Sequence, residues 1–205
     1  MTNDGNQAAA LGFDNSTVAA ARKGDSNALA TIWCALNPKL LRFLRSLGAQ
    51  EPDDIASQIW VEVAQHLERL ADDPHDVRGL LFTIARRRCI DERRRKQRRP
   101  QRSLETLEIS EGGHGPSWQP IADVESTLDA EALLRRLDPT IAELIALRVI
   151  VGLSNAEISR LTGRSEGAIR VATHRGLSHL RTLIESSTSL EVSVTDPMPA
   201  TMDQS

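Results

Sequence analysis

The chain has 205 residues, enough for one medium-sized domain or two small ones, with 25 basic and 28 acidic side chains. Its two cysteines, Cys34 and Cys89, show no CxxC and no paired His–Cys spacing, which argues against a zinc site and a disulfide framework. The start of the chain lacks the pattern of a signal peptide, and no apolar run reaches the ~18 residues of a membrane span, so we expect a cytoplasmic protein without membrane insertion.

Helical signals dominate, because aromatic residues make up only 3% of the chain and alternating β-branched residues are absent. A first helix is predicted over residues 26–36 from apolar side chains at three- and four-residue spacing: Leu29, Ile32, Trp33 and Leu36. Asn37 and Pro38 then have the pattern of an N-cap and the first residue of a second helix. Both cysteines lie in such apolar segments, where buried free thiols are expected.

The next helix is predicted to open at Glu51 and Pro52, with carboxylates in its first turn that complement the helix dipole. A loop over residues 71–76 separates it from a helix that runs from Val77 to a stop at Pro100. Residues 85–99 of that helix read ARRRCIDERRRKQRR, with nine basic and two acidic residues, while the remaining 190 residues carry 16 basic and 26 acidic ones. Such a local basic stretch in an acidic chain indicates contact with nucleic acid.

Prolines and glycines interrupt every periodicity over residues 100–127, which predicts a flexible acidic linker. Helical periodicity returns over residues 128–185, and the Ser- and Thr-rich end of the chain predicts a disordered tail. The predicted fold class is therefore all-α, with two small helical domains joined by a flexible linker. The domain limits are 1–16 for a disordered N-terminus, 17–99 and 128–185 for the helical domains, 100–127 for the linker and 186–205 for the tail.

The second domain contains a helix-turn-helix pattern. Asp138 and Pro139 open a helix that ends at Gly152, and Ser154 with Glu157 forms the Ser-x-x-Glu capping box of the next. A short turn with Gly163 leads to a helix capped by Ser165. The exposed side of this last helix is predicted to carry Arg164, Glu166, Arg170, Thr173, His174 and Arg175, which suit base and phosphate contacts. An ordinary helical hairpin with a solvated basic face remains the alternative to DNA binding.

Three stretches carry a resemblance to a known family: EPDDIASQIWVEVAQHLERL, VRGLLFTIARRRCIDERRR and LDPTIAELIALRVIVGLSNAEISRLTGRSEGAIRVATHRGLSHLR. In this order and spacing the chain resembles the extracytoplasmic-function (ECF) group of sigma-70 factors of bacterial RNA polymerase. The resemblance implies a subunit that directs promoter recognition, DNA melting and transcription initiation, with no catalytic site, cofactor or metal. It implies three partners: core RNA polymerase, through the β′ clamp coiled coil and the β flap, promoter DNA, and an anti-sigma protein.

The resemblance also assigns residues to each contact. Docking on the β′ clamp is implied for Asp54, Ser57, Gln58 and Glu62, with plain solvation of this face as the alternative. Reading of the minus-ten element is implied for Arg86, Arg87, Asp91, Arg93, Arg94 and Arg95, where Asp91 would hold Arg87 or Arg95, four residues away on either side. A pocket for a flipped base is expected in the loop over residues 70–76. Reading of the minus-thirty-five element is implied for Arg164, Ser165, Arg170, Val171, His174 and Arg175.

Two other functions compete with this interpretation. An autonomous helix-turn-helix regulator would bind duplex DNA alone, usually as a dimer, but the chain shows no obvious dimerisation heptad and the basic helix would have no clear use. An enzyme acting on nucleic acid would need a nucleophile or a carboxylate cluster for a metal ion. Asp53 and Asp54 are the only close pair near a basic helix, and on a helix they point about 100° apart, which suits one ion poorly.

Overall fold

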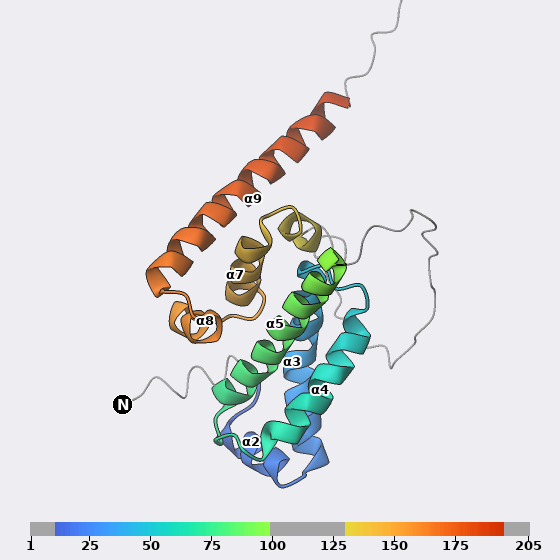
Figure 1. Ribbon diagram of the computed structural model, residues 1–205, viewed down its shortest axis with the longest axis vertical. Helices are drawn as coiled ribbons and strands as arrows, with labels where there is room; N and C mark the ends of the chain where they lie inside the picture. Colours follow the sequence, from blue (N-terminus) through green and yellow to red (C-terminus); the bar gives the residue numbers. More distant parts are fainter. Residues whose placement is uncertain (1–10, 99–129, 195–205) are drawn as a thin grey trace, which may run out of the picture. The chain divides into compact units, whose positions relative to one another are not determined.

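The computed structural model describes residues 11–98 and 130–194, with side chains described for 11–95 and 130–185, and these residues form helices without a strand (Figure 1). They fall into two compact units that divide between Ala132 and Leu133. The N-terminal unit contains α2 (Asn15–Arg22), α3 (Ser26–Ser46), α4 (Pro52–Leu67) and α5 (Pro74–Arg98), and the C-terminal unit contains α7 (Pro139–Val149), α8 (Asn155–Thr162) and α9 (Glu166–Val194). The predicted all-α class with two helical domains is confirmed. The predicted linker lies outside the described residues.

Helix α3 is continuous through Pro38, so the predicted break between two helices at this proline is wrong. A proline inside a helix removes one backbone hydrogen bond. Burial offsets this loss, because Leu36, Leu40 and Phe43 on the two sides of Pro38 are all completely buried. Asn37, the expected N-cap, instead accepts a hydrogen bond at 2.9 Å from the indole Nε1 of Trp60 on α4.

The core of the N-terminal unit lies among α3, α4 and α5. Phe43 and Phe82 meet edge to face with ring centroids 5.5 Å apart, so the only aromatic residue of α5 belongs to the core. Cys89 is buried as predicted, but Cys34 is exposed, and that part of the prediction is wrong. The buried stripe of α3 runs through Ile32 and Leu36, and a residue midway between them points to the opposite side of the helix.

The loop between α4 and α5 covers residues 68–73, three residues earlier than the predicted 71–76, and is fastened at both ends. Helix α5 begins at Pro74, because the Asp73 carboxylate accepts a hydrogen bond at 2.8 Å from the backbone N–H of His75. At the other end Arg22 of α2 forms an ion pair with Asp72 and donates to the backbone carbonyl of Glu68 at 3.1 Å. Helix α2, which precedes the three stretches that carry the family resemblance, therefore helps to shape this loop.

The C-terminal unit has the predicted helix-turn-helix. Asp138 caps α7, and Ser154 and Glu157 form the predicted capping box of α8, with both reciprocal hydrogen bonds present. Helix α8 ends at Gly163, whose φ of 73° lies in the left-handed region that glycine adopts readily. The Ser165 hydroxyl then accepts a hydrogen bond from the N–H of Ala168 in the first turn of α9.

Helix α9 is longer than its sequence pattern indicates. It continues past Glu185 to Val194, so the predicted disordered tail is wrong for residues 186–194, and residues 195–205 lie outside the described part. Its packing on α7 is close at Gly176, which is buried. A Cβ built on Gly176 would lie 2.4 Å from Cγ2 of Ile141 and 2.6 Å from Cδ1 of Ile145.

Candidate nucleic-acid interface

The start of α9 and the turn before it expose polar and basic side chains together with one apolar side chain, Val171. All six residues that the sequence assigned to it are exposed: Arg164, Ser165, Arg170, Val171, His174 and Arg175. The pairs 170/174 and 171/175 are four residues apart, so their side chains are neighbours on the helix surface. Thr173 is an exception to the broader prediction of exposure, because it is buried and its hydroxyl donates to the carbonyl of Ile169 at 2.8 Å.

Helix α5 changes character along its length, from an apolar first half to a charged second half. Leu81, Phe82 and Ala85 are completely buried, whereas the arginines that follow reach solvent. Of the residues predicted to meet the minus-ten element, two are half-buried, Arg86 and Arg93, and four are exposed: Arg87, Asp91, Arg94 and Arg95. The exposed arginines give this end of α5 the charge that phosphate contacts require.

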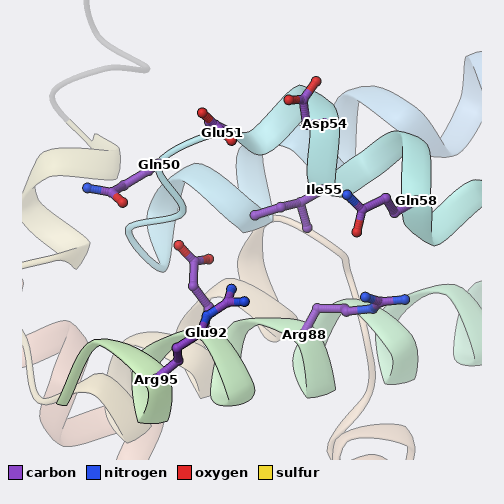
Figure 2. Close-up of a pocket in the computed structure, with 8 residues that line it drawn as sticks. All are labelled: Gln50, Glu51, Asp54, Ile55, Gln58, Arg88, Glu92 and Arg95. Carbon is purple, nitrogen blue, oxygen red and sulfur yellow. The ribbon is translucent and has the colours of Figure 1, made fainter. Parts of the chain in front are cut away.

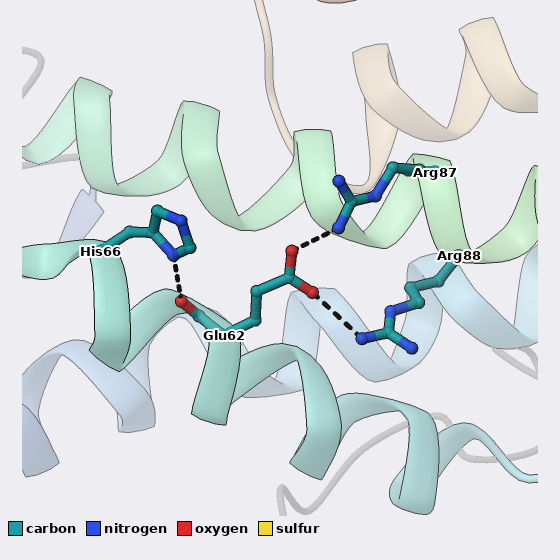
Figure 3. Close-up of polar contacts among 4 residues, drawn as sticks. All are labelled: Glu62, His66, Arg87 and Arg88. Carbon is teal, nitrogen blue, oxygen red and sulfur yellow. Dashed lines mark hydrogen bonds and ion pairs between the residues drawn. The ribbon is translucent and has the colours of Figure 1, made fainter.

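Glu62 of α4 connects the predicted docking helix to the basic helix, as Figure 3 shows. One carboxylate oxygen, Oε1, accepts from Arg87, and the other, Oε2, accepts from Arg88 at 3.1 Å. We expected Asp91 to hold Arg87 or Arg95, but the carboxylate that the structure places on Arg87 is that of Glu62. The Glu62 side chain is only 18% exposed, in contrast to Asp54, Ser57 and Gln58, which are all exposed.

The charge of Glu62 is favoured by these contacts. Partial burial acts to raise the pKa of the Glu62 carboxyl, but the hydrogen bonds and positive charges of Arg88 and Arg87 together outweigh it and hold the pKa below its ordinary value. One turn later, His66 Nδ1 donates to the backbone carbonyl of Glu62 at 2.8 Å. Glu62 is therefore ionised at neutral pH and engaged within the N-terminal unit.

Acid should weaken the N-terminal unit through Glu62. A carboxyl with a lowered pKa contributes stability that is present above its unfolded-state pKa, near 4.5, and is lost as the pH falls through the lower folded-state value. We expect the free energy of unfolding to fall by about 1 kcal/mol more in the wild type than in Glu62→Gln over this range, since Arg87 is well exposed. Urea unfolding at a series of acidic pH values measures this difference. Parallel curves for the two proteins would contradict it.

A cleft of about 470 Å³ lies between α4 and the charged half of α5 (Figure 2). Gln58 of α4 and Arg88 of α5 lie on facing sides of it. The cleft brings together residues predicted for two different contacts, and its lining consists of Gln50, Glu51, Asp54, Ile55, Gln58, Arg88, Glu92 and Arg95. Arg88 and Glu92 were not predicted for either contact. Arg88 and Glu92 are four residues apart, and Glu92 and Arg95 are three apart. This spacing is the sequence signal that places all three side chains on one face of α5.

No cluster of three or more His, Cys, Asp or Glu side chains that could hold a metal ion occurs in the described parts of the two units. The same parts contain no helix long and apolar enough to cross a membrane.

Comparisons with known proteins agree with the arrangement of the helices. The family described as Sigma-70 region 2 matches residues 35–99, and the family described as Sigma-70, region 4 matches residues 127–180. The ECF RNA polymerase sigma factor ShbA of Streptomyces griseus is 32% identical over 174 residues, which cover 80% of this chain and 91% of ShbA. The ECF RNA polymerase sigma factor SigD of Mycobacterium tuberculosis is also 32% identical over 174 residues, covering 82% of each chain.

A solved structure supports the fold independently. The structure of CnrH in complex with the cytosolic domain of CnrY superposes with a TM-score of 0.60, covering 84% of this chain and 97% of that chain. The identity is 22%, so this likeness concerns the arrangement of the helices.

Proposed function

The chain belongs to the extracytoplasmic-function group of sigma-70 factors, and we propose from this premise that its two helical units divide promoter recognition between α5 and α9. As a sigma factor it directs RNA polymerase to promoters, and it is not an autonomous regulator. Members of this group are DNA-binding initiation factors and not enzymes. The observation that carries the division of labour is that both units expose a basic helical surface, at the end of α5 and at the start of α9.

The docking surface for core polymerase is α4. Asp54, Ser57 and Gln58 are exposed there and offer a polar, acidic face to a basic partner such as the β′ clamp coiled coil. Glu62, the fourth residue predicted for this face, is paired with two arginines, which argues for a different use. By the same family likeness we assign the β flap to the C-terminal unit, and an anti-sigma protein as a further partner.

The minus-ten element would be held by the basic end of α5. Arg86, Arg93, Arg94 and Arg95 supply positive charge for phosphate contacts, which fix register and make binding sensitive to salt. A base extruded from the stack needs a shaped pocket. We propose that residues 70–76, which comprise the end of the α4–α5 loop and the first residues of α5, form that pocket, and Arg22 fastens the loop through Asp72 and the Glu68 carbonyl.

The minus-thirty-five element would be read by the start of α9. Arg170 and Arg175 can donate hydrogen bonds to guanine in the major groove or to phosphates of the DNA backbone. His174 can donate to the same groups with a shorter side chain. Val171, which is 50% exposed, can contact a thymine methyl group. Because the Val171 side chain has no hydrogen-bonding group, we expect it to favour a thymine at the base that it meets.

Transcription with purified components tests the function. Core RNA polymerase is incubated with a library of genomic fragments, with and without this protein, and the RNA 5′ ends are mapped. We expect a shared promoter pattern that appears only when both proteins are present. Core polymerase alone and the protein alone are the controls. Tight, specific binding of duplex DNA by the protein alone, with no effect on core polymerase, would overturn the assignment.

A further inference from the structure

One carboxylate holds two consecutive arginines in the N-terminal unit. Glu62 lies on α4, and Arg87 and Arg88 lie on α5, so the contact joins two helices (Figure 3). Consecutive side chains on a helix leave it about 100° apart and would diverge without a common partner. The two oxygens of Glu62 supply that partner, one for each guanidinium.

The contact leaves both arginines able to bind further groups. Each donates a single Nη to Glu62, and a guanidinium has five N–H donors in a fixed fork. The Arg87 side chain is 61% exposed and that of Arg88 is 41% exposed, so part of each fork faces solvent. An arginine that is already oriented loses less conformational freedom when it meets a phosphate than one that is free.

The contact also sets the local charge. Two guanidinium groups and one carboxylate leave a net charge of +1, where the arginines alone would have +2. Excess positive charge strengthens binding to any DNA sequence, because it acts through phosphates and counterion release. Glu62 thus lowers sequence-independent attraction at the place where it restricts the orientation of the donors.

We propose that Glu62 is a positioning residue for promoter DNA, which holds Arg87 and Arg88 as a pre-oriented pair on α5. The inference rests on the proposed function and moves Glu62 from the polymerase-docking surface to the support of the DNA-binding surface. Phosphate contacts made by the oriented pair fix the register of α5 on the promoter, and base reading depends on that register.

Glu62→Gln tests the proposal, because it keeps the shape of the side chain and removes its charge. Holoenzyme formed with core polymerase is titrated with a fork-junction promoter fragment and with the same fragment carrying a scrambled minus-ten element, over a series of salt concentrations. We expect the ratio of the two affinities to fall about 10-fold, and the salt dependence on both fragments to steepen by about one counterion. Affinity for core polymerase should stay within about twofold of the wild type.

Two matched carboxylate variants separate the possible roles. Glu185→Gln removes the same charge from a carboxylate that pairs with Arg181 on α9, at 2.9 Å, and should leave the affinity ratio for the minus-ten element unchanged. Asp54→Asn removes an exposed carboxylate of the docking face and should lower affinity for core polymerase. If Glu62→Gln behaves as Asp54→Asn does, or leaves both the ratio and the salt dependence unchanged, the positioning role is wrong.

A double-mutant cycle covers the case of a poorly folded variant. In an Arg87→Ala, Arg88→Ala background, Glu62→Gln should have no further effect on the affinity ratio, because the groups it positions are absent. A persistent effect of the same size would show that Glu62 acts by another route, and this also overturns the proposal. Wild-type holoenzyme is the reference. If it does not bind the promoter fragment, the proposed function is wrong. If it binds and Glu62→Gln binds in the same way, only the positioning role of Glu62 is wrong.

Discussion

Replacing Arg170 or Arg175 with Ala should weaken holoenzyme binding to a promoter by about 10- to 100-fold and leave affinity for core polymerase unchanged. Both side chains are exposed on the first turns of α9, in the recognition surface that we propose for the helix-turn-helix. A bidentate arginine contact to a guanine contributes roughly 1–3 kcal/mol of discrimination, which sets the size of the effect. Neither residue lies in the packed core, so the variants should fold normally.

The measurement compares promoter fragments with an intact and a scrambled minus-thirty-five element, bound by holoenzyme at fixed salt. Arg181→Ala is the matched control, because Arg181 is an exposed arginine further along α9 that pairs with Glu185 at 2.9 Å. If the arginine reads a base, its Ala variant should bind the intact and the scrambled fragment with similar affinity. If the arginine binds a phosphate, the variant should bind both fragments more weakly by the same factor. Loss of core binding in step with loss of promoter binding would show that the start of α9 is structural.

Features of the fold that depend on short-range chemistry could be predicted from the sequence. The capping box of Ser154 and Glu157 spans three residues, and the side chains that satisfy the helix end are adjacent in the chain. The cap that Asp138 forms before Pro139 also depends only on residues next to it in the chain. The exposed face of α9 followed from the same reasoning except at Thr173, since the buried Ile169 fixes the phase of the first turns.

Features that depend on partners far apart in the chain could not be predicted. Glu62 lies 25 residues from Arg87, so no spacing rule connects them, and the resemblance placed them in different contacts. Arg22 fastens a loop 50 residues away. The break expected at Pro38 is a related error, because the local preference of proline was overruled by burial against α4 and α5. In each case tertiary packing decided what local pattern left open.

Glu62 shows why family position alone is a weak guide to a residue's use. The polar face of α4 repeats every four residues through Asp54, Gln58 and Glu62, and sequence alone treats these three alike. In the structure the first two border the cleft, and the third contacts the arginines of α5. The same helical face is therefore exposed at its start and contacts the protein's own basic helix near its end.

Replacing Gly176 with Val should destabilise the C-terminal unit by about 3 kcal/mol and abolish promoter binding through α9. The Cβ alone would approach Cγ2 of Ile141 to 2.4 Å, and the β-branched methyl groups of Val cannot fold away from α7. Ala should be milder, at about 1 kcal/mol, because its better helix propensity offsets part of the steric cost. Hydrogen exchange of the α7 and α8 amides in the full-length protein measures the loss locally, while the amides of α3 to α5 should keep their protection.

Gly167 provides the matched control on the same helix. It is exposed, and no atom lies within 4 Å of a Cβ built there, so Gly167→Ala should raise stability by about 0.5 kcal/mol. Ile141→Ala in the Gly176→Val background should restore part of the lost protection, because it removes the methyl group that the new side chain meets. Equal effects at both glycines, or no recovery with Ile141→Ala, would mean that α9 needs Gly176 for its backbone and not for its close approach to α7. We expect the close approach of α9 to α7 to be the reason for Gly176. Its φ is not positive, so only the missing side chain distinguishes it from its helical neighbours.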